Sequence, residues 1–184
     1  MINRPFLIHW QIGIVFYLIV AVFLCGCATN IAVTPQTIGN DIKASFQIVG
    51  KVEYDGNKDY LPRTINESSP QSDISIKYEY NITYGRDKTP QALPLFNPLT
   101  IVGFPIGEDT MVITGNLTIS KEEEVIKAYT ATCGLEKTRS IFSEGETFSE
   151  LRKKGLLLVR DNIEIQMCQD KEALLNLIQQ TGGN

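Results

Sequence analysis

The chain has 184 residues, with 17 basic and 21 acidic side chains and a formal net charge of -4 at pH 7. This length suffices for one domain with one hydrophobic core. Basic and acidic residues are interspersed, and this acidic balance without a basic stripe excludes the usual surface of a nucleic-acid binding protein.

The N-terminal segment has the layout of an export signal. Arg4 precedes an apolar stretch from Phe6 to Leu24. Its uninterrupted part, residues 14–24, is about as long as a signal-peptide core and short for a helix that must cross roughly 30 Å of hydrocarbon. We therefore predict export. The alternative is an uncleaved signal anchor in which residues 6–24 span a membrane.

The apolar stretch ends at Leu24–Cys27, which reads Leu-Cys-Gly-Cys. This pattern resembles the signal of bacterial lipoproteins, in which a leucine stands three residues before a cysteine and a small residue stands immediately before it. The resemblance implies that residues 1–26 are a signal peptide, that Cys27 carries the lipid and that acyl chains hold the remainder at a membrane. Ala28 resembles the residue that follows this cysteine in outer-membrane lipoproteins. The implied location is the periplasmic face of the outer membrane, with the inner membrane as the alternative.

Loss of the leader removes the single histidine, His9, and the single tryptophan, Trp10. Without imidazole there is no Ser/His or Cys/His catalytic pair and no histidine-containing zinc site. The sequence also lacks Ser-x-x-Lys, phosphate-loop and dinucleotide-binding motifs. We therefore predict a protein that is not an enzyme and has no catalytic residue, metal or cofactor. A pair of carboxylates, as in glycosidases, is the enzymatic alternative.

Cys133 and Cys168 are the two cysteines that remain once Cys25 leaves with the leader and Cys27 is lipidated. In an oxidising compartment, two thiols favour one disulfide. Closing a loop of 34 intervening residues would stabilise the fold by about 3–4 kcal/mol on the chain-entropy model. The alternative is two separate buried thiols.

Alternating apolar and polar residues predict four strands in the mature chain. Small and polar residues up to Asn40 suit a tether, so we expect residues 27–40 to be the lipidated cysteine and tether and residues 41–184 to be one domain. The charged segment Lys121–Glu124 predicts an antiparallel hairpin between the last two strands. The expected strands cover residues 42–52, 74–84, 111–119 and 125–133.

An apolar segment with four prolines separates the second and third expected strands, over residues 85–110. Long loops of this kind in compact domains are often functional. One interpretation is that the segment packs over an open end of the sheet. The other is an exposed apolar patch that contacts a membrane, a lipid or a partner protein. The predicted contact residues are Leu95, Phe96, Ile101 and Phe104.

The last quarter of the chain changes to helical spacing. Thr147 and Glu150 form a capping-box pattern, and apolar residues then recur every three or four positions. We expect a helix from Thr147 to about Gln180, in one piece or two, with a hairpin over residues 156–167 as the alternative for its middle part.

The predicted fold is therefore α+β: an antiparallel sheet of four or five strands with a long C-terminal helix packed on it. We expect a membrane-anchored periplasmic lipoprotein that serves as a non-enzymatic accessory or adaptor subunit of a cell-envelope assembly. Its expected partners are the membrane, through the lipid, and an envelope protein. The alternative function is binding of a lipid or another apolar molecule between helix and sheet.

Overall fold

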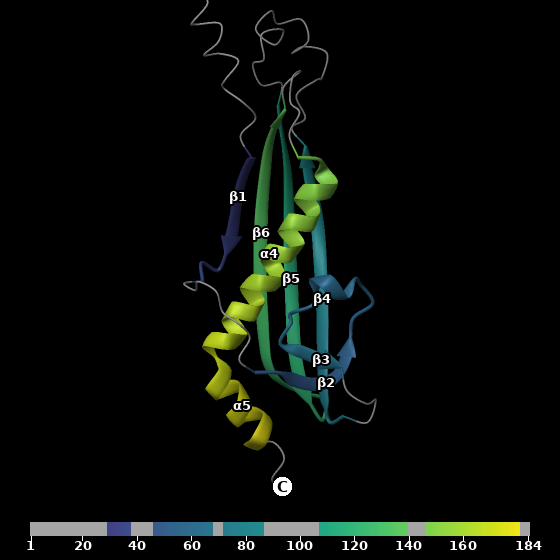
Figure 1. The fold of residues 1–184 in the computed structure, drawn as a ribbon, viewed down its shortest axis with the longest axis vertical. Coiled ribbons are helices and arrows are strands. Elements are labelled where there is room, and N and C mark those ends of the chain that lie inside the picture. The colour runs from purple at the N-terminus through teal and green to yellow at the C-terminus, as the bar shows by residue number, and fades with distance from the viewer. Residues whose placement is uncertain (1–28, 38–45, 68–71, 87–106, 140–145, 181–184) are drawn as a thin grey trace, which may run out of the picture. The chain divides into compact units, whose positions relative to one another are not determined.

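The computed structural model describes residues 29–37, 46–67, 72–86, 107–139 and 146–180 (Figure 1). The chain divides into two compact units. The larger, here called the sheet unit, comprises residues 31–84, 111–135 and 146–184. Of the smaller unit, the structure describes only strand ends, among which Gly85 lies against the Thr110 side chain.

The described residues form six strands, one short 3-10 helix and two α-helices. In chain order these are β1 (Thr29–Thr34), β2 (Ile48–Glu53), η1 (Lys58–Tyr60), β3 (Ile65–Glu67), β4 (Ile74–Arg86), β5 (Gly107–Lys121), β6 (Glu124–Arg139), α4 (Phe148–Gln169) and α5 (Lys171–Gln180).

The strands form one mixed sheet in the order β1-β6-β5-β4-β2-β3. β2 is parallel to both β3 and β4, with Val52 opposite Ile76. The prediction of four or five antiparallel strands is therefore wrong. Alternation reports which side chains face the core but not the direction of a strand. Two short strands also lie outside the four that were expected, one over residues 29–34, in the expected tether, and one over residues 65–67.

The expected hairpin at the charged turn is present, since β5 and β6 are neighbours on either side of Glu122 and Glu123. Both turn residues have positive φ, 50° and 70° respectively. Two-residue hairpin turns of this hand usually use asparagine and glycine, because glycine has no Cβ and asparagine tolerates positive φ better than most other residues.

The prediction of a single long C-terminal helix is also wrong, because the chain forms α4 and α5 with a break at Asp170. Thr147 caps α4, and the capping box with Glu150 is complete. Asp170 leaves the helical conformation (φ -90°, ψ 7°), and its carboxylate lies 2.8 Å from Lys127 Nζ on β6. Residues 156–167, for which a hairpin was the alternative, are helical.

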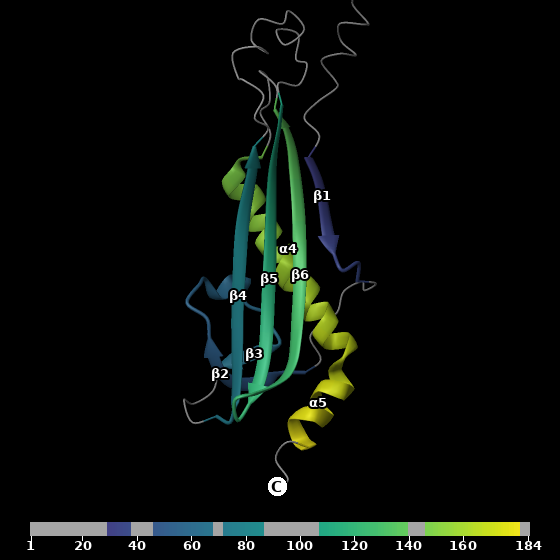
Figure 2. The same cartoon turned by 180° about the vertical axis from the view of Figure 1, so that it is seen from behind.

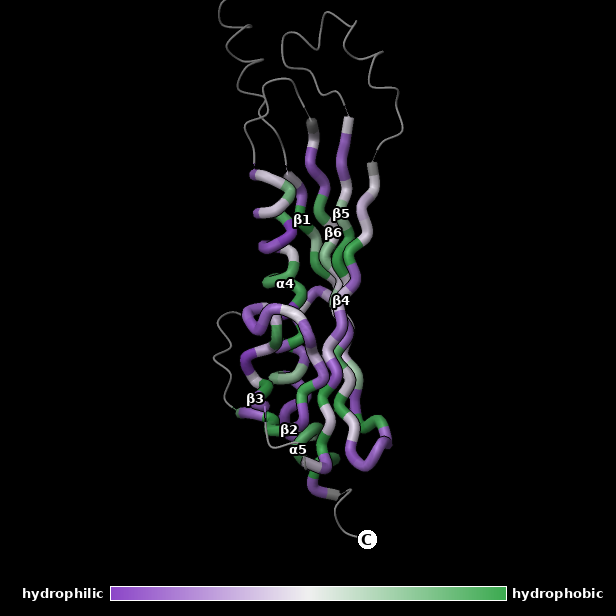
Figure 3. Tube along the Cα trace, turned by 90° about the vertical axis from the view of Figure 1, so that its right-hand side faces the viewer, coloured by the Kyte–Doolittle hydropathy of each residue, from purple (hydrophilic) through white to green (hydrophobic). Residues whose placement is uncertain are grey.

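α4 covers one face of the sheet. Figure 2 shows the opposite face, with the helix behind the strands. Polar and apolar residues alternate along β4, β5 and β6, as the changing colour of the tube in Figure 3 shows. The apolar side chains of these strands meet α4 in the core. Its main members are Ile76, Tyr78, Met111, Ile113, Leu117, Ile119, Tyr129, Ala131, Cys133, Leu135, Leu151, Leu156, Val159, Ile163 and Met167.

Two glycines bring α4 unusually close to the sheet. A Cβ at Gly115 on β5 would stand 2.5 Å from Val159 Cγ1, and one at Gly155 on α4 would stand 2.7 Å from Ile113 Cδ1. Real Cβ atoms do not approach neighbours so closely. We call this crossing the apolar contact; it depends on the absence of a side chain on both partners.

Candidate functional site

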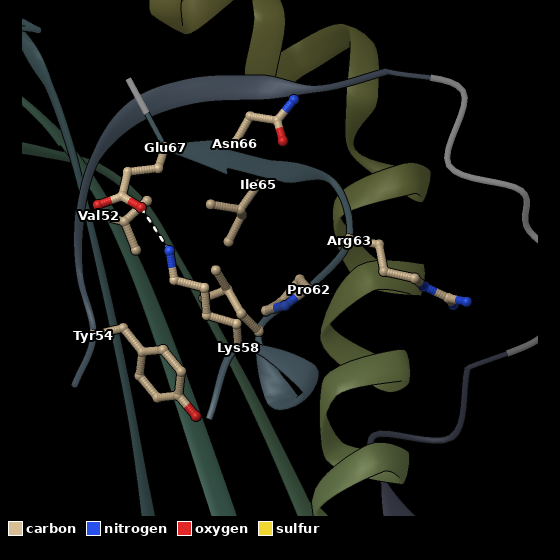
Figure 4. Close-up of a pocket in the computed structure, with 9 residues that line it drawn as sticks. Val52, Tyr54, Lys58, Pro62, Arg63, Ile65, Asn66 and Glu67 are labelled. Carbon is tan, nitrogen blue, oxygen red and sulfur yellow. Dashed lines mark hydrogen bonds and ion pairs between the residues drawn. The ribbon is translucent and has the colours of Figure 1, made fainter. Parts of the chain in front are cut away.

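A pocket of about 420 Å³ lies beside β2, β3 and η1, and we call it the β2–β3 pocket (Figure 4). Its volume is within the usual range of small-molecule sites. The walls come from one continuous stretch of chain that leaves β2, passes through η1 and returns as β3. Its lining residues are Val52, Tyr54, Lys58, Leu61, Pro62, Arg63, Ile65, Asn66 and Glu67.

The short helix η1 and Tyr54 are fixed by local hydrogen bonds. Asn57 caps η1 by accepting a hydrogen bond from the Asp59 amide at 2.9 Å. The Tyr54 hydroxyl donates to the Asn57 carbonyl at 3.0 Å, and its ring lies 5.2 Å from that of Tyr78 between centroids. Partial burial, with Tyr80 and Tyr60 nearby, raises the pKa of Tyr54 to about 12. One wall of the pocket is therefore held in place without a ligand.

Two opposite charges meet at the mouth of this pocket. Lys58 Nζ donates to Glu67 Oε2 at 2.8 Å, and Figure 4 shows the lysine side chain reaching across the apolar lining to the carboxylate. This hydrogen bond raises the pKa of Lys58 and lowers the pKa of Glu67. Both side chains are largely exposed, 81% for the lysine and 61% for the glutamate, so water screens the pair and its net stabilisation is small.

A second set of charges joins the pocket segment to α4, and we call it the charged contact. Arg63 points away from the pocket (Figure 4), and its Nε and backbone amide donate to Glu164 Oε2 at 3.1 Å and 3.3 Å. This interaction raises the pKa of Arg63. Arg160 pairs with Asp161 at 2.6 Å and donates to the Asp59 carbonyl. Glu164 is buried and Arg63 is exposed. Loss of the arginine would therefore leave a buried charge without its partner, whereas loss of the glutamate would leave the arginine in water.

A second pocket, of about 590 Å³, opens beside the edge of β4 and includes Tyr54 in its lining. β2 pairs with β4 only over Ser75–Lys77. Beyond this point the described residues provide no strand on that side of β4 as far as Tyr84. We call Tyr78–Tyr84 the β4 edge. The pocket beside it is lined by Tyr54, Asp55, Tyr78, Glu79, Tyr80, Asn81 and Asn116.

The face of the sheet opposite α4 carries no charged side chain over residues 112–120 of β5 and 128–134 of β6. Side chains pair across the two strands, with Thr114 and Thr132 hydroxyls 3.2 Å apart and Thr130 donating to Asn116 at 2.9 Å. We call this surface the open face. Its outward positions are Val112, Thr114, Asn116, Thr118, Ser120, Ala128, Thr130, Thr132 and Gly134.

The predicted disulfide is not formed, since Cys133 and Cys168 are both free thiols. Cys133 is buried on β6, and its Sγ would lie 3.7 Å from a Cβ at Gly155. Cys168 is on α4, thirteen residues after Gly155, which corresponds to about 20 Å along the helix axis. A disulfide needs Cα atoms less than about 7 Å apart. α4 does pack against β6, but the turn that lies beside Cys133 contains Gly155 and not Cys168.

The other predicted site residues, Cys27 and the contact set Leu95, Phe96, Ile101 and Phe104, lie outside the described residues. Within the described ranges, no helix is long and apolar enough to cross a membrane, and no three His, Cys, Asp or Glu side chains gather as a metal site would require. The sequence analysis predicted neither pocket, because it assigned no strand to residues 53–73, which supply most of the β2–β3 pocket, and gave no indication of which neighbours lie beside Tyr78–Asn81.

No protein-family model matches the chain, and a comparison with curated proteins found no match.

Proposed function

We propose that the protein is a lipid-anchored, non-enzymatic accessory subunit of a cell-envelope assembly, and that a partner protein binds by adding a strand to the β4 edge. The lipoprotein-like pattern at Leu24–Cys27 supports the anchor and the periplasmic face of the outer membrane. The β4 edge, which has no strand beside it in the part of the chain that the structure describes, supports the docking mode and is the observation on which the proposal depends.

The β4 edge is long enough to accept a partner strand. Its seven residues span about 23 Å at the usual rise of a strand. The backbone donors and acceptors along an unpaired edge are a template for strand addition, and a neighbouring pocket can take side chains of the added strand. The pocket that Tyr54 and Asn81 help to line provides that space.

Two other parts of the sheet perimeter, at β3 and beside β6, are protected by a short strand or by side chains. β3 has only three residues. Beside β6, Gln166 Nε2 donates to the Thr130 carbonyl at 3.0 Å, and Lys127 pairs with Asp170. Covering an edge in this way is a common defence against unwanted pairing. The outer edge of β1 is the remaining alternative for a partner strand and serves as a comparison site.

Site-specific photo-crosslinking in cells tests the docking mode. A benzophenone amino acid at Asn81 or Thr83 should crosslink one defined protein, whereas the same group at Thr118 on the open face or Ala32 on β1 should not. Crosslinks of equal yield at Thr118 or Ala32 would contradict docking at the β4 edge. Phe96→Asp and Phe104→Asp test the predicted apolar contact set separately, by loss of the same crosslinked product.

The anchor needs its own test, because docking does not depend on it. Metabolic labelling with a fatty-acid analogue should label the wild type and not Cys27→Ser. Absence of label on the wild type would exclude lipidation and favour the signal anchor.

A further inference from the structure

We infer that the β2–β3 pocket binds a small zwitterion with an apolar body, whose ammonium group pairs with Glu67 and whose anionic group pairs with Lys58. The inference goes beyond the proposed docking of a partner protein, and it rests on a different part of the sheet unit.

The lining of the pocket fits the apolar body. Pro62 and Ile65 are buried and Val52 and Leu61 are half-buried, and all four contribute to the wall. A pocket of about 420 Å³ is at the lower end of the range for small-molecule sites, and such sites are mostly apolar with a few polar groups that fix orientation. The ligand is therefore compact, with a branched or aromatic side group rather than a sugar.

The mouth of the pocket fits the two charges. Among the described residues, Lys58 and Glu67 have each other as ion-pair partners, at 2.8 Å. Their pairing is solvent-exposed and weak, so little stability is lost when the two groups separate to hold a ligand. Once separated, they present one cation and one anion side by side. An ammonium and a carboxylate or phosphate on the same molecule satisfy both groups.

A ligand with only one charge satisfies only one side of the mouth. A simple carboxylate that pairs with Lys58 takes this lysine from Glu67, and a simple amine does the reverse. In each case the other protein charge is left to water, so a ligand with one charge gains one ion pair at the mouth whereas a zwitterion gains two. The mouth thus selects zwitterions over single ions of the same shape.

The pocket is preorganised by contacts that a ligand does not need to make. Asn57 caps η1, Arg160 holds the Asp59 carbonyl at 2.6 Å, and Arg63 fastens the start of β3 to Glu164 on α4. The Ile48 amide also donates to the Thr64 carbonyl at 2.8 Å. Because these walls are already ordered, binding requires only the two mouth side chains to rearrange, and this lowers its entropic cost.

Two sources supply this chemistry: free amino acids with apolar side chains, and phospholipids with an ethanolamine head group. Both join an ammonium group to an anionic group over a few bonds and carry an apolar part, although the acyl chains of the phospholipid exceed the pocket of about 420 Å³ and only its head-group end could enter. A choline head group differs, because its quaternary ammonium has no N–H to donate to Glu67.

The test uses the full chain purified in detergent and titrated with L-phenylalanine, 3-phenylpropionate and 2-phenylethylamine. Calorimetry gives the affinities, and methyl NMR of Val52 and Ile65 reports on the pocket. We expect L-phenylalanine to bind at least about tenfold more tightly than either analogue, which lacks one of the two charges. Detergent micelles containing phosphatidylethanolamine or phosphatidylcholine form the second arm, and only the former should shift the same methyl signals if the source is a lipid.

The variants Lys58→Met and Glu67→Gln should each weaken binding of the preferred zwitterion by about tenfold or more. Lys51→Met and Glu53→Gln are the matched controls, because this ion pair, at 3.2 Å on β2, lies outside the pocket lining. Combining Lys58→Glu with Glu67→Lys keeps both charges and should restore binding relative to either single reversal. All of these side chains are exposed, so folding is expected to survive.

Three results would overturn the inference. One is that neither L-phenylalanine nor phosphatidylethanolamine changes the Val52 and Ile65 signals at millimolar concentration. Another is that single-charge analogues, or phosphatidylcholine, bind as well as the zwitterion that donates N–H groups. The third is that the Lys51 and Glu53 controls weaken binding as much as the pocket variants do.

Discussion

The apolar contact and the charged contact both fasten α4 to the sheet unit, but they do so by opposite means. At the apolar contact, Gly115 and Gly155 bring backbone and side chains together until no room remains for a methyl group. At the charged contact, Arg63 reaches from an exposed position to Glu164, which is buried. The first depends on shape and the second on a charge balance, so different changes should break each of them.

Gly115→Ala should have the largest effect, because its new methyl group would meet Val159 Cγ1 at 2.5 Å. Overpacking of this kind costs about 1–3 kcal/mol, and we expect the upper part of this range in the free energy of unfolding measured with denaturant. Val159→Ala in the same chain removes the opposing atoms. The double variant should recover part of the loss, and strictly additive losses would show that the glycine is not needed for this contact.

Arg63→Ala should break the charged contact with a smaller loss. It leaves the Glu164 carboxylate buried without its cation, and removing one partner from a fully buried pair costs about 3–5 kcal/mol. Arg63 is 61% exposed, so water can reach the site and we expect about 1–2 kcal/mol. Adding Glu164→Gln should restore part of the stability. Arg152→Ala, on the exposed side of α4, is the matched control and should change little.

Glu123→Gly, at a position outside both contacts, should stabilise the protein. Its φ of 70° strains any residue with a Cβ, and glycine removes a penalty of roughly 1 kcal/mol. Thermal or denaturant unfolding measures the gain. A loss of stability would mean that the glutamate side chain contributes more than its backbone conformation costs.

Tyr78→Phe should have the smallest effect on stability at neutral pH and a larger effect at high pH. The Tyr78 hydroxyl is buried without a hydrogen-bond partner among the described residues, so removing it should be neutral or stabilising by about 0.5–1 kcal/mol. The hydroxyl lies beside Gly115, where the Cβ of an alanine would stand 3.1 Å from it. Tyr78 therefore belongs to the apolar contact.

Burial raises the pKa of Tyr78 above its unfolded value near 10. A raised pKa means that the folded state holds the proton more tightly than the unfolded state. The stabilisation is therefore complete below pH 10 and is lost as the pH rises above it. The wild type should lose stability above pH 10 more steeply than Tyr78→Phe, in denaturant unfolding followed at several pH values. Equal slopes would assign the alkaline sensitivity to other tyrosines, such as Tyr54, whose pKa is raised to about 12.

The sequence predicted the elements whose signals are local. Thr147 and Glu150 marked the start of α4, and the alternation from Ile74 onward located β4, although Tyr84 at its end is 57% exposed. It did not predict the parallel pairing of β2 with β4, because no local pattern reports strand direction. It also missed Glu164, since a buried carboxylate within a helical pattern looks like an ordinary surface residue until Arg63, 101 positions away, is placed beside it.

The position of α4 after all six strands also determines when the protein can fold. Until the chain has been made as far as Met167, the apolar side chains of β4, β5 and β6 have no helix to cover them. Pairings between residues so distant in sequence form slowly, and exposed apolar sheets are prone to aggregate in the interval. The newly made strands therefore expose an apolar face until α4 has been synthesised.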